Sequence, residues 1–169
     1  MGSMKNRMWV RSIWLFSIAV VVFACEMIDD DEGRASRSSP VGTYQAEDGA
    51  VTNGSVHAEE PEYTGAGYVK PNDGGAVQWI DVSGGTAGGP HIIAIRYAHE
   101  GNVKDWELLV NGQSLGQLRP TATGRLSSWA SHDWEVDLQP GSNTVRLKAI
   151  DYTAGPLFDR IDVYTRATN

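Results

Sequence analysis

The sequence predicts an all-β fold, a jelly-roll sandwich of two antiparallel β-sheets that follows a signal peptide and a flexible tether. From Tyr44 onward apolar residues recur at every second position, and no stretch keeps a helical period for three turns. The chain contains 19 glycines, and those after Tyr44, together with the turn signals between apolar segments, divide this region into short strands. About seven to nine strands at this spacing are typical of a sandwich, with a closed barrel as the alternative.

Two neighbouring segments show the strand pattern most clearly. In "HDWEVDL" (132–138), Trp134, Val136 and Leu138 share one face, and the acidic residues share the other. "NTVRLKA" (143–149) repeats this alternation, and "QPGS" between the two segments is a turn. Both segments are therefore predicted as half-buried antiparallel strands, with Trp134 in the core.

Three further strands are predicted at 76–82, 91–98 and 160–164, separated by glycine-rich connections. Trp79, in the first of them, is assigned to packing. Asn111-Gly112 lies between "WELLV" and "QSLGQL" and is the strongest two-residue hairpin signal in the chain.

The N-terminal segment is predicted to direct export. Three basic residues precede an apolar run at 13–24, which is too short to span a bilayer comfortably because a spanning helix needs about 20 residues. The run ends at "VFAC", which resembles the lipobox of bacterial lipoproteins. We therefore expect 1–25 to be a signal peptide and Cys25 to be lipidated, which would anchor the protein to the bacterial envelope. An ordinary signal peptide and a secreted product are the alternative.

Residues 26–43 contain an acidic cluster and small polar residues, so this segment is predicted as a linker, and 44–165 as the folded module. The net charge is -7 and the pI is about 5.0. Since nucleic-acid binding depends on clustered Lys and Arg, and no basic stripe is present, a nucleic-acid partner is excluded.

Two oxygen-bearing side chains open the module. Gln45 and Glu47 are two residues apart on a strand, so they point the same way. Near the other end, Asp159 is in phase with the inward-facing Ile161, and a carboxylate that enters a core needs a compensating charge. A bound calcium ion would supply this charge if the first and last strands were neighbours. The alternative is that Glu47 pairs with Arg160 and that Asp159 only ends a turn.

Six segments follow one another in an order that resembles the carbohydrate-binding modules of families 6 and 35. They cover the chain from about Tyr44 to Tyr164 and are "YQAEDGAV", "EYTGAGYV", "IAIRYAHEGN", "LLVNGQSLGQL", "PTATGRLSSWASHDWEVDLQPGSNTVRL" and "GPLFDRIDV". The resemblance implies a jelly roll with a structural calcium ion and a glycan site among the loops. It places the calcium ligands at Gln45, Glu47 and Asp159, with Asp162 as second choice.

Loop aromatics are the candidates for sugar binding, because a sugar ring presents a face of C–H bonds that packs on an aromatic ring. The resemblance places sugar-stacking residues in the segments that hold Tyr63, Tyr68 and Trp129. The loop at 98–106 offers polar groups for sugar hydroxyls or a uronic carboxylate, namely His99, Asn102, Lys104 and Asp105.

One position departs from the resemblance. Related modules carry a sugar-binding asparagine just before the final strand, where this chain has Leu157. An exposed apolar patch at Leu157 would favour a second hypothesis, a structural or adhesive lipoprotein that binds another envelope protein.

Catalysis is not expected. No G-x-S-x-G, H-E-x-x-H, P-loop or Rossmann motif is present, and the four histidines are scattered. The leading hypothesis is therefore a non-catalytic binder of a polysaccharide or oligosaccharide, with a glycoside hydrolase as a further candidate partner.

Overall fold

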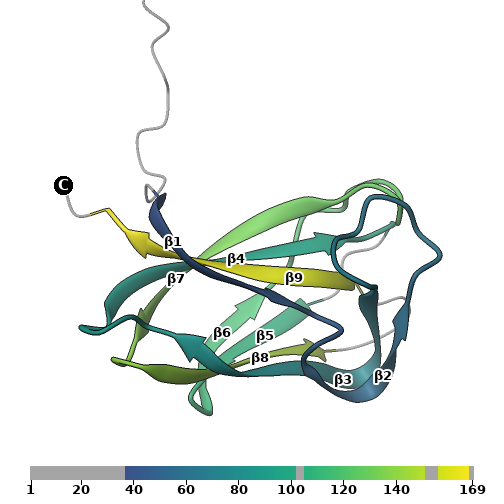
Figure 1. Ribbon diagram of the computed structural model, residues 1–169. Helices are drawn as coiled ribbons and strands as arrows, with labels where there is room; N and C mark the ends of the chain where they lie inside the picture. The colour runs from purple at the N-terminus through teal and green to yellow at the C-terminus, as the bar shows by residue number, and fades with distance from the viewer. Residues whose placement is uncertain (1–36, 102–104, 151–155, 168–169) are drawn as a thin grey trace, which may run out of the picture. The chain divides into compact units, whose positions relative to one another are not determined.

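The computed structural model describes residues 37–101, 105–150 and 156–167, and these ranges contain strands and no helix (Figure 1). Within them, no helix long and apolar enough to cross a membrane is found. The strands are β1 (Arg37–Gln45), β2 (Ala50–His57), β3 (Tyr68–Ser83), β4 (Gly89–Ala98), β5 (Asp105–Val110), β6 (Gln113–Leu118), β7 (Ala130–Leu138), β8 (Ser142–Ile150) and β9 (Leu157–Arg166).

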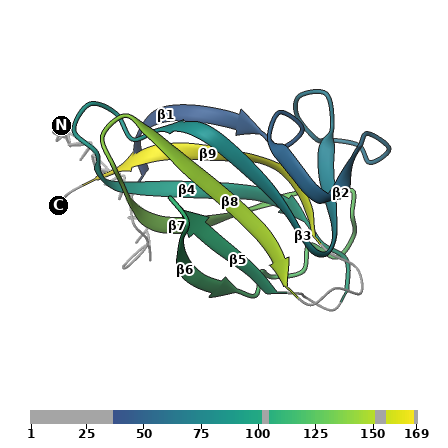
Figure 2. The ribbon, with the colours of Figure 1, turned by 90° about the horizontal axis from the view of Figure 1, so that it is seen from below.

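The strands form two antiparallel layers (Figures 1 and 2). One layer contains β1, β9, β4 and β7, and the other contains β2, β3, β8, β5 and β6. A single residue pair, Val69 with Phe158, joins the layers through β3 and β9. Among the described residues no pairing joins the end strands β6 and β7, so the fold is a sandwich and not a closed barrel. The predicted all-β jelly roll is confirmed.

The clearest sequence signals are found where they were predicted. The alternating segments at 132–138 and 143–149 lie in β7 and β8. Asn111 and Gly112 have φ angles of 50° and 79°, as a two-residue hairpin between β5 and β6 requires. Local pattern and turn chemistry were sufficient for these elements.

The first strand begins earlier than the predicted module boundary at Tyr44. β1 starts at Arg37 and pairs with β9, with Arg37 opposite Arg166 and Pro40 opposite Tyr164. Arg37 pairs with Asp133, and its guanidinium lies 4.9 Å from the centroid of the Tyr164 ring. β1 is an edge strand with exposed polar residues in its first half, so its sequence carries no apolar alternation that could identify it.

The core lies between the layers. Trp106 is fully buried and meets Tyr97 and Phe158 edge-on, with ring centroids 4.8 and 4.9 Å apart. Trp79 is 3% exposed, which confirms its assignment to packing, and Trp134 is half-buried against the core. β9 pairs with β1, β4 and β3, so its N-terminal residues lie beside several elements of the candidate site.

Candidate functional site

The loop at residues 64–67 gathers the three predicted metal ligands. Thr64 Oγ1 donates a hydrogen bond to Gln45 Oε1 at 3.0 Å. The N–H groups of Ala66 and Gly67 donate to Glu47 Oε1 at 2.5 and 3.2 Å. The Thr64 N–H donates to Asp159 Oδ1 at 2.7 Å, and Asp159 Oδ2 lies 2.9 Å from Thr64 Oγ1, so it shares the single hydroxyl proton with Gln45. We call the group formed by Gln45, Glu47, Asp159 and residues 64–67 the carboxylate cradle.

Strand pairing explains why residues so distant in sequence meet. β1 and β9 are antiparallel neighbours, with Gln45 opposite Arg160, and the N–H of Ala46 donates to the carbonyl of Asp159 at 2.8 Å. Gly65 lets the loop close over Glu47. Its φ is +71°, and a Cβ there would lie 2.1 Å from Glu47 Oε1, so a side chain at this position would displace the carboxylate.

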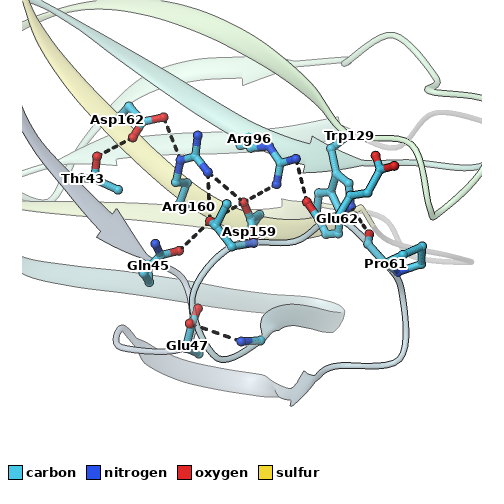
Figure 3. Close-up of polar contacts among 12 residues, drawn as sticks. Thr43, Gln45, Glu47, Pro61, Glu62, Arg96, Trp129, Asp159, Arg160 and Asp162 are labelled. Atoms are coloured by element: carbon cyan, nitrogen blue, oxygen red, sulfur yellow. Dashed lines mark hydrogen bonds and ion pairs between the residues drawn. The ribbon is translucent and has the colours of Figure 1, made fainter.

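Asp159 lies at the centre of a charged network (Figure 3). Its side chain is fully buried, and Oδ2 accepts a hydrogen bond from Arg96 Nη1 at 2.6 Å and another from Arg160 Nη1 at 3.5 Å. Arg160 Nε also donates to Asp162 Oδ2 at 2.9 Å, and Thr43 Oγ1 donates to Asp162 Oδ1 at 2.6 Å. Asp159 therefore does not only end a turn, because it lies in β9 and in an ion-pair network. Arg160 pairs with Asp159 and Asp162 and not with Glu47, which accepts backbone N–H groups.

The oxygen atoms of the cradle fit a hard cation in part. Glu47 Oε2 is buried and has no hydrogen-bond partner within the described part of the chain, which is costly for a carboxylate oxygen. Calcium prefers carboxylate and amide oxygens, which Glu47 and Gln45 supply. Asp159 already has two arginines that offset its charge. Within the described ranges, no three His, Cys, Asp or Glu side chains form a metal-binding group, so a cation here would also depend on the amide oxygen of Gln45.

Three predicted sugar-binding aromatics lie together, and one of them, Trp129, contacts Arg96. Tyr68 is 3% exposed, whereas Tyr63 and Trp129 are half-buried. The rings of Tyr63 and Trp129 each meet Tyr68 edge-on, at centroid distances of 5.7 and 5.6 Å. Trp129 Nε1 donates to the carbonyl of Pro61 at 2.8 Å, which fixes the orientation of the indole. We call Tyr63, Tyr68 and Trp129 the aromatic cluster; Tyr68 supports the other two, which retain exposed surface.

An acidic group borders the cluster. The Tyr68 hydroxyl donates to Glu59 Oε2 at 3.2 Å, and the His57 ring stacks on Tyr68 at 6.0 Å. A hydrogen bond from its own backbone N–H, followed by one from His57, lowers the pKa of Glu59. Burial raises the pKa of Tyr68. Glu59 is thus an exposed, charged acceptor at the edge of the aromatic cluster.

The polar residues predicted in the 98–106 loop differ in their access to a ligand. His99 is fully buried, so its side chain cannot reach a ligand at the surface. Asp105 has a side chain that is 30% exposed and accepts hydrogen bonds from Arg119 at 2.7 and 3.3 Å. Lys104 and Asn102 lie outside the described residues, as do Cys25 and the predicted signal peptide.

Leu157 is not part of an exposed apolar patch. It is 1% exposed and packs with Tyr68 and Ala98 behind the aromatic cluster. The exposed large apolar side chains of the described residues are elsewhere, at Val56, Ile80 and Leu115. The feature that would favour docking of a protein at Leu157 is therefore absent.

Arg96 is the residue of the site that the sequence prediction missed. It contacts both the carboxylate cradle and the aromatic cluster, since its guanidinium lies 5.1 Å from the centroid of the Trp129 ring. A signal was available, because Arg96 stands between Ile95 and Tyr97 in a run of apolar residues at 92–98. A charge in such a strand indicates a buried partner.

A β-sandwich with an aromatic cluster among its loops and strand ends is the architecture of β-sandwich carbohydrate-binding modules, and solved structures of this class match the chain. A family 35 carbohydrate-binding module from Paenibacillus barcinonensis is 32% identical with a TM-score of 0.67, and the match covers 76% of this chain and 99% of that one. A family 35 module from Clostridium thermocellum is 29% identical with a TM-score of 0.70, with the same coverage. The chain belongs to carbohydrate-binding module family 35.

Relatives among complete enzymes match only in part. Endo-1,4-β-xylanase B of Cellvibrio japonicus is 33% identical over 118 residues, which are 66% of this chain and 19% of the enzyme. The chain spans between 10% and 19% of the length of the curated relatives it matches. No family model matches the chain.

Proposed function

We propose that this chain binds a polysaccharide without catalysing a reaction, by stacking sugar rings on Trp129 and Tyr63. The observation that carries the proposal is the aromatic cluster, in which Tyr68 supports two half-buried rings and Pro61 fixes the indole of Trp129. Sugar C–H faces pack on such rings, and sugar hydroxyls take polar partners at the rim, a position that Glu59 occupies. Membership of family 35 supports the same function.

The proposed binding is weak for a single site. An aromatic contact contributes about 0.5–1.5 kcal/mol beyond the burial of surface, and association itself costs several kcal/mol. Several modules on one surface, or one module joined to an enzyme, raise the effective affinity for a polymer by multivalency.

The proposal includes no glycoside hydrolysis, because neither Asp159 nor Glu59 suits the role of a general acid. A glycosidase needs two accessible carboxyl groups, one of which is a general acid with a raised pKa. Asp159 is fully buried behind Arg96. Glu59 is exposed, but its pKa is lowered, which is opposite to the requirement for a general acid.

Calcium is part of the proposal. Gln45, Glu47 and Asp159 would hold the ion, whose charge would offset that of the Glu47 carboxylate and stiffen the loop at 64–67. The support is the buried Oε2 of Glu47, which has no hydrogen-bond partner among the described residues.

The proposed location is the bacterial envelope, with lipidation at Cys25 as the anchor and an unlipidated, secreted form as the alternative. The support for export is the charged and apolar N-terminal sequence. A glycoside hydrolase is the proposed protein partner, because the matching region makes up a small part of enzymes such as the xylanase.

Native affinity gels test the proposal. The purified protein is run through xylan, arabinan, β-1,3-galactan, chitosan and polygalacturonate, and compared with Trp129→Ala and Tyr63→Ala. Trp134→Ala is the matched control, since Trp134 is also half-buried but lies outside the aromatic cluster. We expect retention by at least one glycan, about tenfold weaker affinity in each cluster variant, and no change in the control. Unchanged retention of both cluster variants would exclude this site, and no retention by any glycan would contradict the function.

A further inference from the structure

Arg96 is the one Arg, Lys, Asp or Glu of β4, and its side chain is only 18% exposed. Residues 92–95 and 97–98 of the strand are buried apolar residues. A charge is costly in this position unless partners compensate for it, so the contacts of Arg96 show what retains it.

The guanidinium makes three contacts in different directions (Figure 3). Nη1 donates to Asp159 Oδ2 at 2.6 Å, and Nη2 donates to the carbonyl of Glu62 at 2.8 Å. The guanidinium carbon lies 5.1 Å from the centroid of the Trp129 ring. A planar guanidinium can hydrogen-bond two oxygens and pack on an aromatic ring at the same time, and an ammonium group cannot reproduce this geometry.

The loop that follows Pro61 closes this set of contacts. The carbonyl of Pro61 accepts a hydrogen bond from the indole N–H of Trp129, and the carbonyl of the next residue, Glu62, accepts one from Arg96. Thr64, two residues further on, donates twice to Asp159. The segment at 61–64 is therefore fixed to Trp129 at one end and to Asp159 at the other, while Arg96 contacts both residues directly.

We propose that Arg96 is a positioning residue that transmits the state of the buried Asp159 carboxylate to Trp129, so that events in the carboxylate cradle set the position of the indole. A cation bound to Asp159 Oδ2 would compete with Arg96 Nη1 for that oxygen, and a displaced guanidinium would change its contact with the Trp129 ring. An effect of this coupling on sugar binding rests on the proposed function, in which a sugar ring stacks on Trp129. The coupling itself is tested without a glycan.

The test uses the fluorescence of Trp129 in the purified protein, obtained as the difference between each protein and its Trp129→Phe counterpart. Asp159→Asn is introduced into the wild type and into Arg96→Lys, which keeps the charge but not the planar contacts. Arg37→Lys is the matched control, since Arg37 also combines an aspartate partner with an aromatic ring, but at β1. Arg96→Gln serves if Arg96→Lys does not unfold cooperatively. Titration with Ca²⁺ alone is a second arm.

We expect Asp159→Asn to change the emission and acrylamide quenching of Trp129 in the wild type and in Arg37→Lys, and to change both much less in Arg96→Lys, where only the route through residues 61–64 remains. Ca²⁺ should act on Trp129 in the same Arg96-dependent way. An equal effect of Asp159→Asn in the Arg96→Lys background, or no effect in the wild type, would overturn the inference. Absence of glycan retention would instead contradict the proposed function, so the two failures are distinguishable. If calorimetry detects no binding of Ca²⁺, the Asp159→Asn arm alone decides.

Discussion

Replacement of Asp159 by asparagine should destabilise the module markedly. The side chain is fully buried and accepts hydrogen bonds from Arg96, from Arg160 and twice from Thr64. Asparagine has nearly the same shape and can still accept the Thr64 N–H through Oδ1. Its amide nitrogen would then take the place of Oδ2. This nitrogen is a donor, and it would face three other donors, the guanidinium groups of Arg96 and Arg160 and the hydroxyl of Thr64.

The magnitude follows from the burial of the partners. Loss of one member of a buried ion pair costs about 3–5 kcal/mol. Arg96 and Arg160 have side chains that are 18% and 23% exposed, so both can recover some hydration when Asp159 is neutral. We therefore expect the lower end, a loss of about 3 kcal/mol in the free energy of unfolding. For a domain of this size that corresponds to a fall of about 10 °C in Tm.

Urea and thermal unfolding monitored by circular dichroism measure this loss. Glu135→Gln is the control, because it also changes a carboxylate to an amide, but in an exposed pair with Arg166. An exposed pair contributes about 0–1 kcal/mol. If Asp159→Asn lowered the free energy of unfolding no more than Glu135→Gln does, the buried ion-pair network would not hold this part of the fold together.

Three further predictions concern the cradle and the aromatic cluster. Gly65→Ala should lower the free energy of unfolding by about 2 kcal/mol and Gly124→Ala by about 1 kcal/mol in urea unfolding. Both glycines have positive φ, but only at position 65 would a Cβ clash with a side chain, that of Glu47. Equal losses for the two variants would contradict this explanation. Calcium at 100 times its Kd should raise the free energy of unfolding by about 2.7 kcal/mol relative to the protein in EGTA, and Glu47→Gln should abolish this difference. Identical melting of the wild type in both conditions would contradict the proposed calcium site. Burial raises the pKa of Tyr68 and of Tyr97, so each tyrosine stabilises the fold fully below the unfolded pKa of about 10 and loses that contribution as pH rises through the folded pKa. Unfolding between pH 9 and 11 should show this decline, and Tyr68→Phe should reduce its slope; an unaltered slope would refute the assignment.

The fold could be predicted because local signals and tertiary structure agree over most of the sandwich. The alternation in β7 and β8 and the Asn111-Gly112 hairpin depend on residues close in sequence. β1 before Tyr44 could not be predicted, since an exposed edge strand with polar side chains needs no apolar pattern.

The sequence predicted the members of the candidate site only in part, since it missed Arg96 and included the buried His99. Gln45, Glu47 and Asp159 were expected to meet, and the loop at 64–67 contacts all three. The sequence does not reveal which donors occupy the oxygens, because Arg96 approaches from another strand. Whether a tyrosine supports a site or lines its surface also depends on packing between layers, and Tyr68 is buried for this reason.

The burial of Leu157 also changes the interpretation of the departure from the family pattern. An asparagine at this position would place a polar side chain among Tyr68 and Ala98, whereas leucine fills the space with apolar contacts. The chain therefore places a packing residue behind the aromatic cluster, and the proposed polar contact of a ligand lies at the rim, where Glu59 is exposed.

The most direct measurement follows the tryptophan indole N–H signals of the folded module by NMR while the protein is titrated with an oligosaccharide of the glycan selected in the affinity gels. We predict that the Trp129 signal shifts first and most, and that the signal of Trp134 stays in place. A shift of Trp134 with Trp129 unmoved would contradict the proposal that sugar rings stack on the aromatic cluster.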